Sequence, residues 1–242
     1  YNERSDLISK TVLNFQGKLC EETLINNKFN ELSNYCVLYG QGKDKKIVIW
    51  GDSHSARIAR PLINGTIKDE SIYMITHNAC PPLEGVIYKN TQHKSGPCYD
   101  DKFGIKVVDY INSLDSDVVI LVARWPMYLN GYNENIYHKY SITSDLYKDF
   151  SINSSITNTI KRLNAQQIIV IFPPIELTKQ INIKQRFIQP GNYFKKLKID
   201  YLQSRQDLKK LVIQNKKINF FDIKEYFCKN NDCKYSNVPM YY

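Results

Sequence analysis

Five short apolar runs are separated by segments of helix length along the chain. The runs are rich in Ile, Val and Phe, and they are Ile47–Trp50, Ile72–Thr76, Val118–Ala123, Ile168–Phe172 and Ile218–Ile223. The segments between them are Ser55–Ile63, Lys102–Ser113, Leu146–Leu163 and Phe194–Gln214. Because each run is apolar on both faces, we predict parallel strands that are covered by helices on both sides. The alternation predicts a three-layer α/β/α sandwich with a mostly parallel, five-stranded sheet.

The first 43 residues do not join this alternation, because they are polar and rich in Asn. We predict that residues 1–43 form an N-terminal extension or linker and that residues 44–242 form one α/β domain. No window has the roughly 18 apolar residues that a membrane-spanning helix needs. The chain begins with Tyr instead of Met, so we expect it to be a piece of a longer polypeptide.

The net charge of +9 arises from 33 Lys and Arg against 24 Asp and Glu. A basic balance can indicate a nucleic-acid partner. Here the basic residues are spread along the chain and form no Arg-rich stripe, so we predict that the protein binds no nucleic acid.

Six cysteines fall into three local pairs, each in a segment that is typical of loops. The pairs are Cys20 with Cys36, Cys80 with Cys98, and Cys228 with Cys233. Spacing alone does not fix the pairing. Zinc binding is the competing interpretation, but short Cys-x-x-Cys pairs and His partners are missing, so we predict no metal site. Three disulfides would place the chain in an oxidising compartment such as a periplasm.

The stretch "KKIVIWGDSHSARIARPL" carries the candidate chemistry. Ser53 follows the first predicted strand, where ligands bind in open α/β sheets. Gly51 permits a sharp turn, and either Asp52 or Ser53 can cap the helix that follows. The Ser53 N–H at the helix start could then stabilise an oxyanion. The alternative is that Ser53 is only a helix cap.

Three stretches together, "GDSHSARIARPL", "ACPPL" and "DVVILVARW", resemble the periplasmic SGNH domain of acyltransferase-3 membrane proteins. The resemblance extends from about Ile47 to the C-terminus and includes the loop with Cys228 and Cys233. These proteins O-acetylate O-antigen and other surface polysaccharides. The resemblance implies that Ser53 is a nucleophile, while Asp52 and His54 frame the motif. It leaves His54 as a packing or substrate-binding group.

The resemblance also implies an oxyanion hole, and at both of its other positions this sequence departs from the family pattern. In place of a Gly after the second strand it has "THNAC", where the Asn78 side chain or nearby amides could serve. In place of an Asn after the third strand it has Arg124, whose guanidinium is a competent donor or, alternatively, an ion-pair partner of a carboxylate. Trp125 could stack on a sugar or fill the end of the sheet.

A serine nucleophile needs a base, which the family supplies from an Asp-x-x-His segment after the last strand. The last histidine of this chain is His138, so we expect the base to lie beyond Tyr242 and the isolated chain to be poorly active. His77, His93 and His138 are the internal alternatives.

The leading hypothesis is a periplasmic O-acetyltransferase domain, held at the inner membrane by an acyltransferase-3 domain of the same polypeptide. Ser53 would carry the acetyl group to a sugar hydroxyl of a surface polysaccharide. The resemblance implies acetyl-CoA as the donor, used through the membrane domain, because this chain has no Gly-rich phosphate loop that would bind a coenzyme. The alternatives are a secreted carbohydrate esterase and a non-catalytic carbohydrate-docking module.

Overall fold

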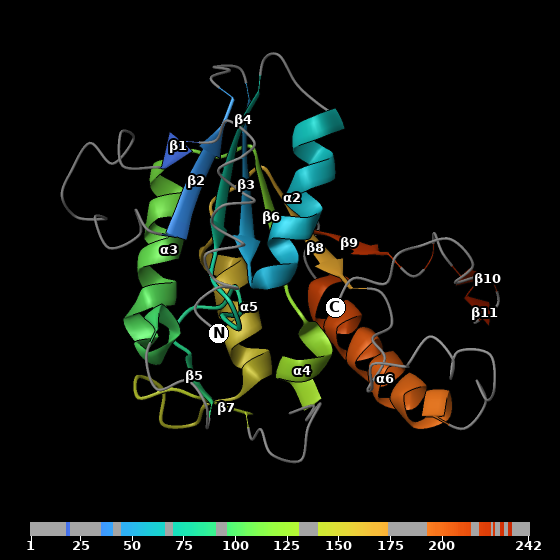
Figure 1. The fold of residues 1–242 in the computed structure, drawn as a ribbon. Coiled ribbons are helices and arrows are strands. Elements are labelled where there is room, and N and C mark those ends of the chain that lie inside the picture. The colour runs from blue at the N-terminus through green and yellow to red at the C-terminus, as the bar shows by residue number, and fades with distance from the viewer. Residues whose placement is uncertain are drawn as a thin grey trace.

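A computed structural model describes residues 18–19, 35–40, 45–65, 70–90, 96–130, 140–173, 193–213, 218–223, 225, 228–229 and 232–233. In these residues seven strands form one sheet in the order β1-β2-β4-β3-β6-β8-β9 (Figure 1). Their bounds are β1 Lys18–Leu19, β2 Cys36–Tyr39, β3 Lys45–Gly51, β4 Glu70–Thr76, β6 Val118–Val122, β8 Gln167–Phe172 and β9 Ile218–Asp222. The five strands from β4 to β9 are parallel, and each coincides with a predicted apolar run.

The sheet is larger than the five strands that we predicted. Strand β2 pairs with the free edge of β4 in antiparallel orientation, and β1 pairs with β2 in the same way. Both strands come from the predicted N-terminal extension. The run Cys36-Val37-Leu38-Tyr39 is short but mostly buried, so it covers an edge that would otherwise expose unpaired main-chain groups. Part of the predicted extension therefore completes the domain.

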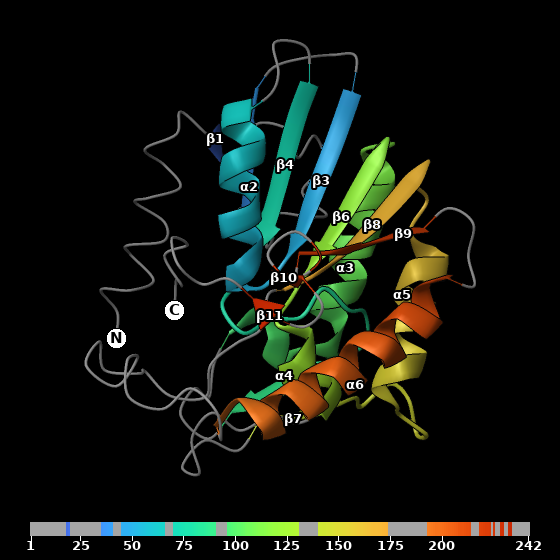
Figure 2. The ribbon, with the colours of Figure 1, turned by 90° about the vertical axis from the view of Figure 1, so that its right-hand side faces the viewer.

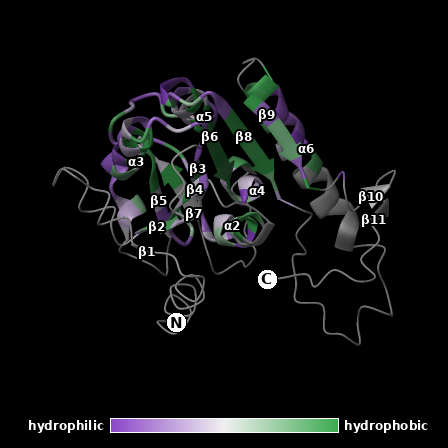
Figure 3. Cartoon of the chain, turned by 90° about the horizontal axis from the view of Figure 1, so that it is seen from above, coloured by the Kyte–Doolittle hydropathy of each residue, from purple (hydrophilic) through white to green (hydrophobic). Residues whose placement is uncertain are grey.

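Helices cover both faces of the sheet, as a mostly parallel sheet requires (Figure 2). Helix α2 (Ser53–Gly65) packs on one face, where Ile49 of β3 points. On the other face, Val48 and Trp50 join a larger core that includes residues of the short helix α4 (Trp125–Asn130) and of three longer helices. These are α3 (Asp101–Ser113), α5 (Ile152–Arg162) and α6 (Tyr193–Ile213). All five residues of β6 are buried, and Figure 3 draws β6 and β8 in the green of hydrophobic residues.

Helix α5 begins six residues later than the predicted helix, which started at Leu146. The side chain of Ser151 accepts a hydrogen bond from the Ser154 N–H at 3.1 Å and so caps the helix start. The Ser144 hydroxyl instead accepts from the Leu146 and Tyr147 N–H groups, which holds this segment as a loop. The predicted helix included the apolar residues Leu146 and Tyr147 of this loop, but the side chains of both are exposed.

Several shorter elements complete the described part of the chain. They are the helix α4 (Trp125–Asn130), the antiparallel ribbon of β5 (Ile87–Asn90) and β7 (Tyr140–Thr143), the turn η3 (Pro97–Tyr99), and the ribbon of β10 (Cys228–Lys229) and β11 (Asp232–Cys233). No helix in the described ranges combines the length and apolar character that crossing a membrane requires.

The predicted disulfide between Cys80 and Cys98 is present, with 5.6 Å between the two Cα atoms. It connects the turn after β4 to the start of α3. The register of β10 and β11 sets Cys228 opposite Cys233, as their predicted disulfide needs. Cys36 is disulfide-bonded, and its predicted partner, Cys20, lies outside the described residues.

Candidate active site

The order of the parallel strands places a crevice at the carboxyl end of β3. The chain moves from β3 to β4 on one side and then crosses to β6 on the other, so β3 lies at the switch point where open α/β sheets bind ligands. Gly51 ends this strand. A Cβ atom on Gly51 would lie 1.8 Å from the Val122 carbonyl oxygen, which leaves no space for any other residue. Ser53 follows two residues later as the first residue of α2, and it is partly exposed.

Asp52, not Ser53, caps helix α2. The Asp52 Oδ1 atom accepts from the His54 N–H at 2.9 Å, which is the hydrogen bond of an N-cap side chain. Within the part of the chain that the structure describes, no group hydrogen-bonds to the Ser53 hydroxyl or accepts from its N–H. Asp52 therefore takes the capping role that the alternative gave to Ser53, and among the described residues the Ser53 hydroxyl and N–H have no hydrogen-bond partner.

The Asp52 carboxylate joins three segments of the site. Its Oδ1 atom also contacts Nδ1 of His54 at 3.1 Å. Its Oδ2 atom accepts from the Arg124 N–H at 2.8 Å and from the Tyr128 hydroxyl at 2.9 Å. Burial alone would raise the pKa of Asp52, but the His54 imidazole and the two main-chain N–H donors outweigh burial and lower it. This carboxylate is thus a fixed anion that holds the start of α2 against the segment after β6.

The main chain of the Ser53 turn is fixed from the β4 side as well. The Asp52 carbonyl accepts from the Ser55 N–H at 2.9 Å, and it lies 2.7 Å from the Ser55 hydroxyl and 2.9 Å from that of Thr76. Thr76 is the last residue of β4. These contacts leave the turn little freedom, so the position of Ser53 is preorganised.

The turn after β4 supplies candidate oxyanion donors beside this serine. The His77 N–H donates to the Gly51 carbonyl at 3.4 Å, which holds the turn next to the end of β3. Ala79 has a φ of 56°, a left-handed conformation that is unusual for alanine. No described residue accepts from the N–H of Asn78 or Ala79. The Asn78 side chain is exposed. The candidate oxyanion donors of this turn are therefore the Asn78 side-chain amide and the main-chain N–H groups of Asn78 and Ala79.

The two candidate residues after β6, Arg124 and Trp125, differ in their exposure to solvent. The Arg124 N–H is occupied by Asp52, but the residue is only partly buried and directly follows the strand beside β3. Its guanidinium therefore stays a candidate donor. Trp125 is 1% exposed, and its Nε1–H donates to the Ile171 carbonyl at 2.9 Å. The prediction that Trp125 stacks on a sugar is wrong, because its ring fills the end of the sheet.

A comparison with protein-family models agrees with this geometry. The model described as "SGNH domain (fused to AT3 domains)" matches residues 20–242, which is nearly the whole chain. The chain belongs to this SGNH family. Membership connects it with acyl-transfer chemistry on polysaccharides and with a membrane acyltransferase partner domain. A search of curated proteins found no match.

Among the described residues of this SGNH domain, no histidine hydrogen-bonds to Ser53. His54 is paired with Asp52 as described above. The Nδ1 atom of His77 lies 2.9 Å from the Asn78 carbonyl, and its ring contacts Tyr35 edge-on at 5.2 Å between centroids. The other internal alternatives, His93 and His138, lie outside the described residues. The prediction of a base beyond Tyr242 stays a prediction.

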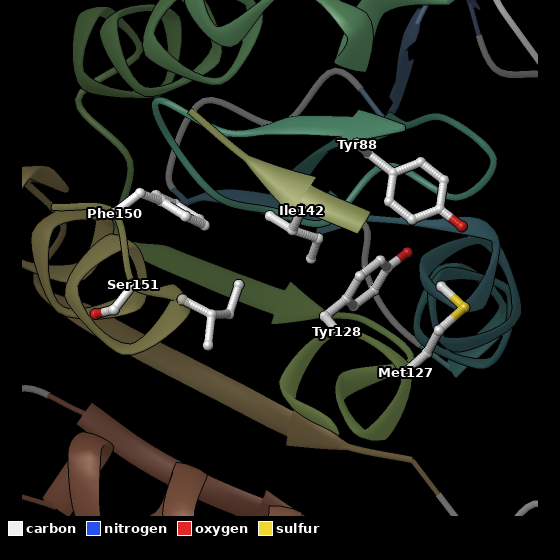
Figure 4. Close-up of a pocket in the computed structure, with 7 residues that line it drawn as sticks. Tyr88, Met127, Tyr128, Ile142, Phe150 and Ser151 are labelled. Atoms are coloured by element: carbon white, nitrogen blue, oxygen red, sulfur yellow. The ribbon is translucent and has the colours of Figure 1, made fainter. Parts of the chain in front are cut away.

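Sequence reasoning missed Tyr128 altogether. It lies on α4, is 5% exposed, and donates to a carboxylate that is 76 positions away in the sequence. Its ring also lines a cavity of about 260 Å³ (Figure 4). The other lining residues come from both strands of the β5–β7 ribbon, from α4 and from the start of α5: Tyr88, Met127, Ile142, Phe150, Ser151 and Ile152. Only the closeness of Tyr128 to "ARW" in the sequence could have suggested a role in the site.

Proposed function

We propose that this SGNH domain transfers acetyl groups to a sugar hydroxyl of a bacterial surface polysaccharide, such as O-antigen, through an ester on Ser53. One observation carries the proposal. The Ser53 side chain is partly exposed at the switch point, and the neighbouring carboxylate, not Ser53, caps the helix. A hydroxyl that contributes nothing to the local fold is available for chemistry.

The reaction takes place in two displacements. In the first, Ser53 Oγ bonds to the acetyl carbon and its proton passes to a base, which gives that proton to the donor group as this group leaves with the electron pair of the broken acyl bond. In the second, the sugar hydroxyl attacks the Ser53 ester, gives its proton to the same base, and Ser53 recovers its proton as the ester breaks. The donor is an acetyl thioester such as acetyl-CoA, relayed by a membrane domain. The base is the histidine expected beyond Tyr242.

The oxyanion that develops in both steps lies near main-chain N–H groups. The Ser53 N–H is at the positive end of α2, the N–H groups of Asn78 and Ala79 belong to the turn that follows the neighbouring strand β4, and the Arg124 guanidinium is a further candidate donor. Ser53 and the turn after β4 are held together through the Asp52 carbonyl and Thr76. This arrangement supports an acyl-transfer role, and it would serve periplasmic esterase chemistry equally well if water replaced the sugar.

Paired serine variants in the complete natural polypeptide test the proposal. Ser53→Ala should abolish polysaccharide acetylation while the melting temperature stays within about 1 °C. Ser151→Ala is the matched control, because Ser151 is a true helix cap. Its loss should lower stability by about 1 kcal/mol and leave acetylation intact. Acetylation that survives Ser53→Ala would support the docking module instead, and release of free acetate without sugar modification would support the esterase.

A further inference from the structure

The hydroxyl of Tyr128 shares one carboxylate oxygen with the segment that carries Arg124. Asp52 Oδ2 accepts from the Tyr128 hydroxyl at 2.9 Å and from the Arg124 N–H at 2.8 Å. The other oxygen, Oδ1, accepts from the first turn of α2. Asp52 thereby connects α4 to the start of α2 and to the Arg124 segment, which carry candidate oxyanion donors.

Packing alone does not fix the ring of Tyr128. One side of the ring contacts Tyr88 edge-on, with 5.9 Å between ring centroids and 76° between the ring planes. The ring also borders the cavity of about 260 Å³, so it has empty space beside it (Figure 4). Close-packed interiors hold side chains by contact on all sides, and this ring lacks that constraint. The hydrogen bond to Asp52 therefore adds a constraint on the ring and its hydroxyl that packing leaves out on the cavity side.

Tyr128 remains a neutral donor at every physiological pH. Burial raises the pKa of its phenol well above the usual value, and the negative charge of Asp52 raises it further. The groups that face the Asp52 carboxylate are His54 from α2, Arg124 after β6, and Tyr128 from α4, with Tyr88 of β5 behind the last. His54 and Arg124 contact this carboxylate through nitrogen atoms. Among the described residues, Tyr128 is the one hydroxyl donor to it.

We propose that Tyr128 is a positioning residue of the acyl-transfer site, acting through Asp52 on the Ser53 turn and on Arg124. The inference rests on the proposed function of Ser53. Without the hydroxyl, Oδ2 keeps only the Arg124 N–H, and α4 is no longer tied to the carboxylate. Helix α4, which Arg124 directly precedes, can then shift relative to the carboxylate and the start of α2. Since the oxyanion donors must meet charge that develops in the transition state, the shift lowers kcat more than it raises KM.

The test compares two conservative variants of the same cavity in the complete polypeptide. Tyr128→Phe removes the donor to Asp52 and keeps the ring. Tyr88→Phe is the matched control, because it removes a hydroxyl from the neighbouring ring and keeps the hydrogen bonds of Asp52 with His54, Arg124 and Tyr128. We expect Tyr128→Phe to lower kcat for acetyl transfer about tenfold with KM for the acceptor unchanged, and Tyr88→Phe to stay within about twofold. Rates are measured at a temperature at which circular dichroism shows both variants folded.

A double-mutant cycle identifies the route of the effect. If Tyr128 acts through Asp52, Tyr128→Phe should lower kcat in the wild-type background but change it less than twofold in an Asp52→Asn background. Equal effects in both backgrounds, or a Tyr128→Phe kcat within twofold of wild type, would overturn the proposal while Ser53→Ala still abolishes transfer. Transfer that survives Ser53→Ala would remove the proposed function itself, and this inference with it.

Discussion

Two carboxylates, Asp52 and Glu84, are each 1% exposed, yet they belong to different kinds of region. Asp52 is surrounded by donors that come from the site: the first turn of α2, the segment after β6, and α4. The Glu84 side chain lies 2.5 Å from Arg162 Nη1, and Asp109 shares that guanidinium at 2.6 Å. Its main chain is tied to Ser155 and Thr159 of α5. Glu84 thus fastens scaffold helices together, while Asp52 fastens the parts of the site.

The pKa values of the two groups move in opposite directions. For both, burial is the largest influence and raises the pKa. For Asp52 the imidazole and main-chain donors outweigh it, and the pKa falls below 3.8. For Glu84 the single guanidinium does not outweigh burial, the charge of Asp109 adds to it, and the pKa rises above 4.5. Low solvent exposure alone therefore says little about a carboxylate, and the donors around it help to decide whether it is held as an anion.

The largest effect expected from this difference is that of Asp52→Asn. Each oxygen of the carboxylate faces a main-chain N–H, from His54 on one side and Arg124 on the other. An amide can turn its oxygen to only one of them, so its NH₂ group always faces a donor. We expect acetyl transfer to fall about 100-fold or more and stability to fall by about 2 kcal/mol. Steady-state kinetics and chemical denaturation measure the two changes, and transfer within tenfold of wild type would contradict the role given to Asp52.

The same change at the other carboxylate should affect stability alone. In Glu84→Gln, the side-chain oxygen can still accept from Arg162, and the lost charge is one that burial already disfavours. We expect a stability loss of about 1 kcal/mol, near 3 °C in melting temperature for a domain of this size, with kcat unchanged. A loss of transfer comparable to that of Asp52→Asn would remove the distinction between site and scaffold.

The opposite pKa shifts predict opposite pH dependences of stability. The native pKa of Asp52 is depressed, so its contribution to stability is complete above the unfolded value and is lost as the pH falls below about 4. The native pKa of Glu84 is raised, so its contribution declines as the pH rises from about 4.5 through that native value. The free energies of unfolding of Asp52→Asn, Glu84→Gln and the wild type, measured between pH 3 and 7, test these opposite pH dependences. The wild-type advantage over Asp52→Asn should shrink toward low pH, and that over Glu84→Gln should grow.

The smallest effects concern two residues with positive φ, one in each region. Ala79 at 56° lies beside the site, and Asp115 at 51° lies in the turn after α3. Glycine adopts this conformation without the strain of a Cβ atom. We expect Ala79→Gly and Asp115→Gly each to stabilise the fold by up to about 1 kcal/mol, with transfer within about twofold. If Ala79→Gly lowered the melting temperature while Asp115→Gly raised it, the two turns would differ in a way that φ does not explain.

The sequence predicted the parts of the molecule that depend on local pattern. The five parallel strands are continuous apolar runs, and Ser53 follows the first of them directly, so its place at the sheet edge needed no distant information. Strand β2 was missed because four residues in polar surroundings give little signal. The loop before α5 was assigned to helix because its Leu146 and Tyr147 are apolar, and only the structure shows that they are exposed.

The contacts that organise the site could not be predicted in this way. The bond between Asp52 and Tyr128 joins positions 76 residues apart, and neither local sequence marks it. The position of Trp125 was left open between two interpretations for a related reason. A tryptophan next to a strand end can face the crevice or the core, and the choice depends on the carbonyl of Ile171, which comes from another strand.

The central claim is that Ser53 carries the acetyl group, and its most direct test is to find the group there. Membranes that contain the complete polypeptide are supplied with isotope-labelled acetyl-CoA in the absence of a polysaccharide acceptor, digested, and examined by mass spectrometry. The account predicts labelled acetyl on the peptide around Gly51-Asp52-Ser53, located on the Ser53 oxygen and removed when acceptor is added. Labelled acetyl on a different residue that passes to the acceptor at the rate of the overall reaction would contradict it.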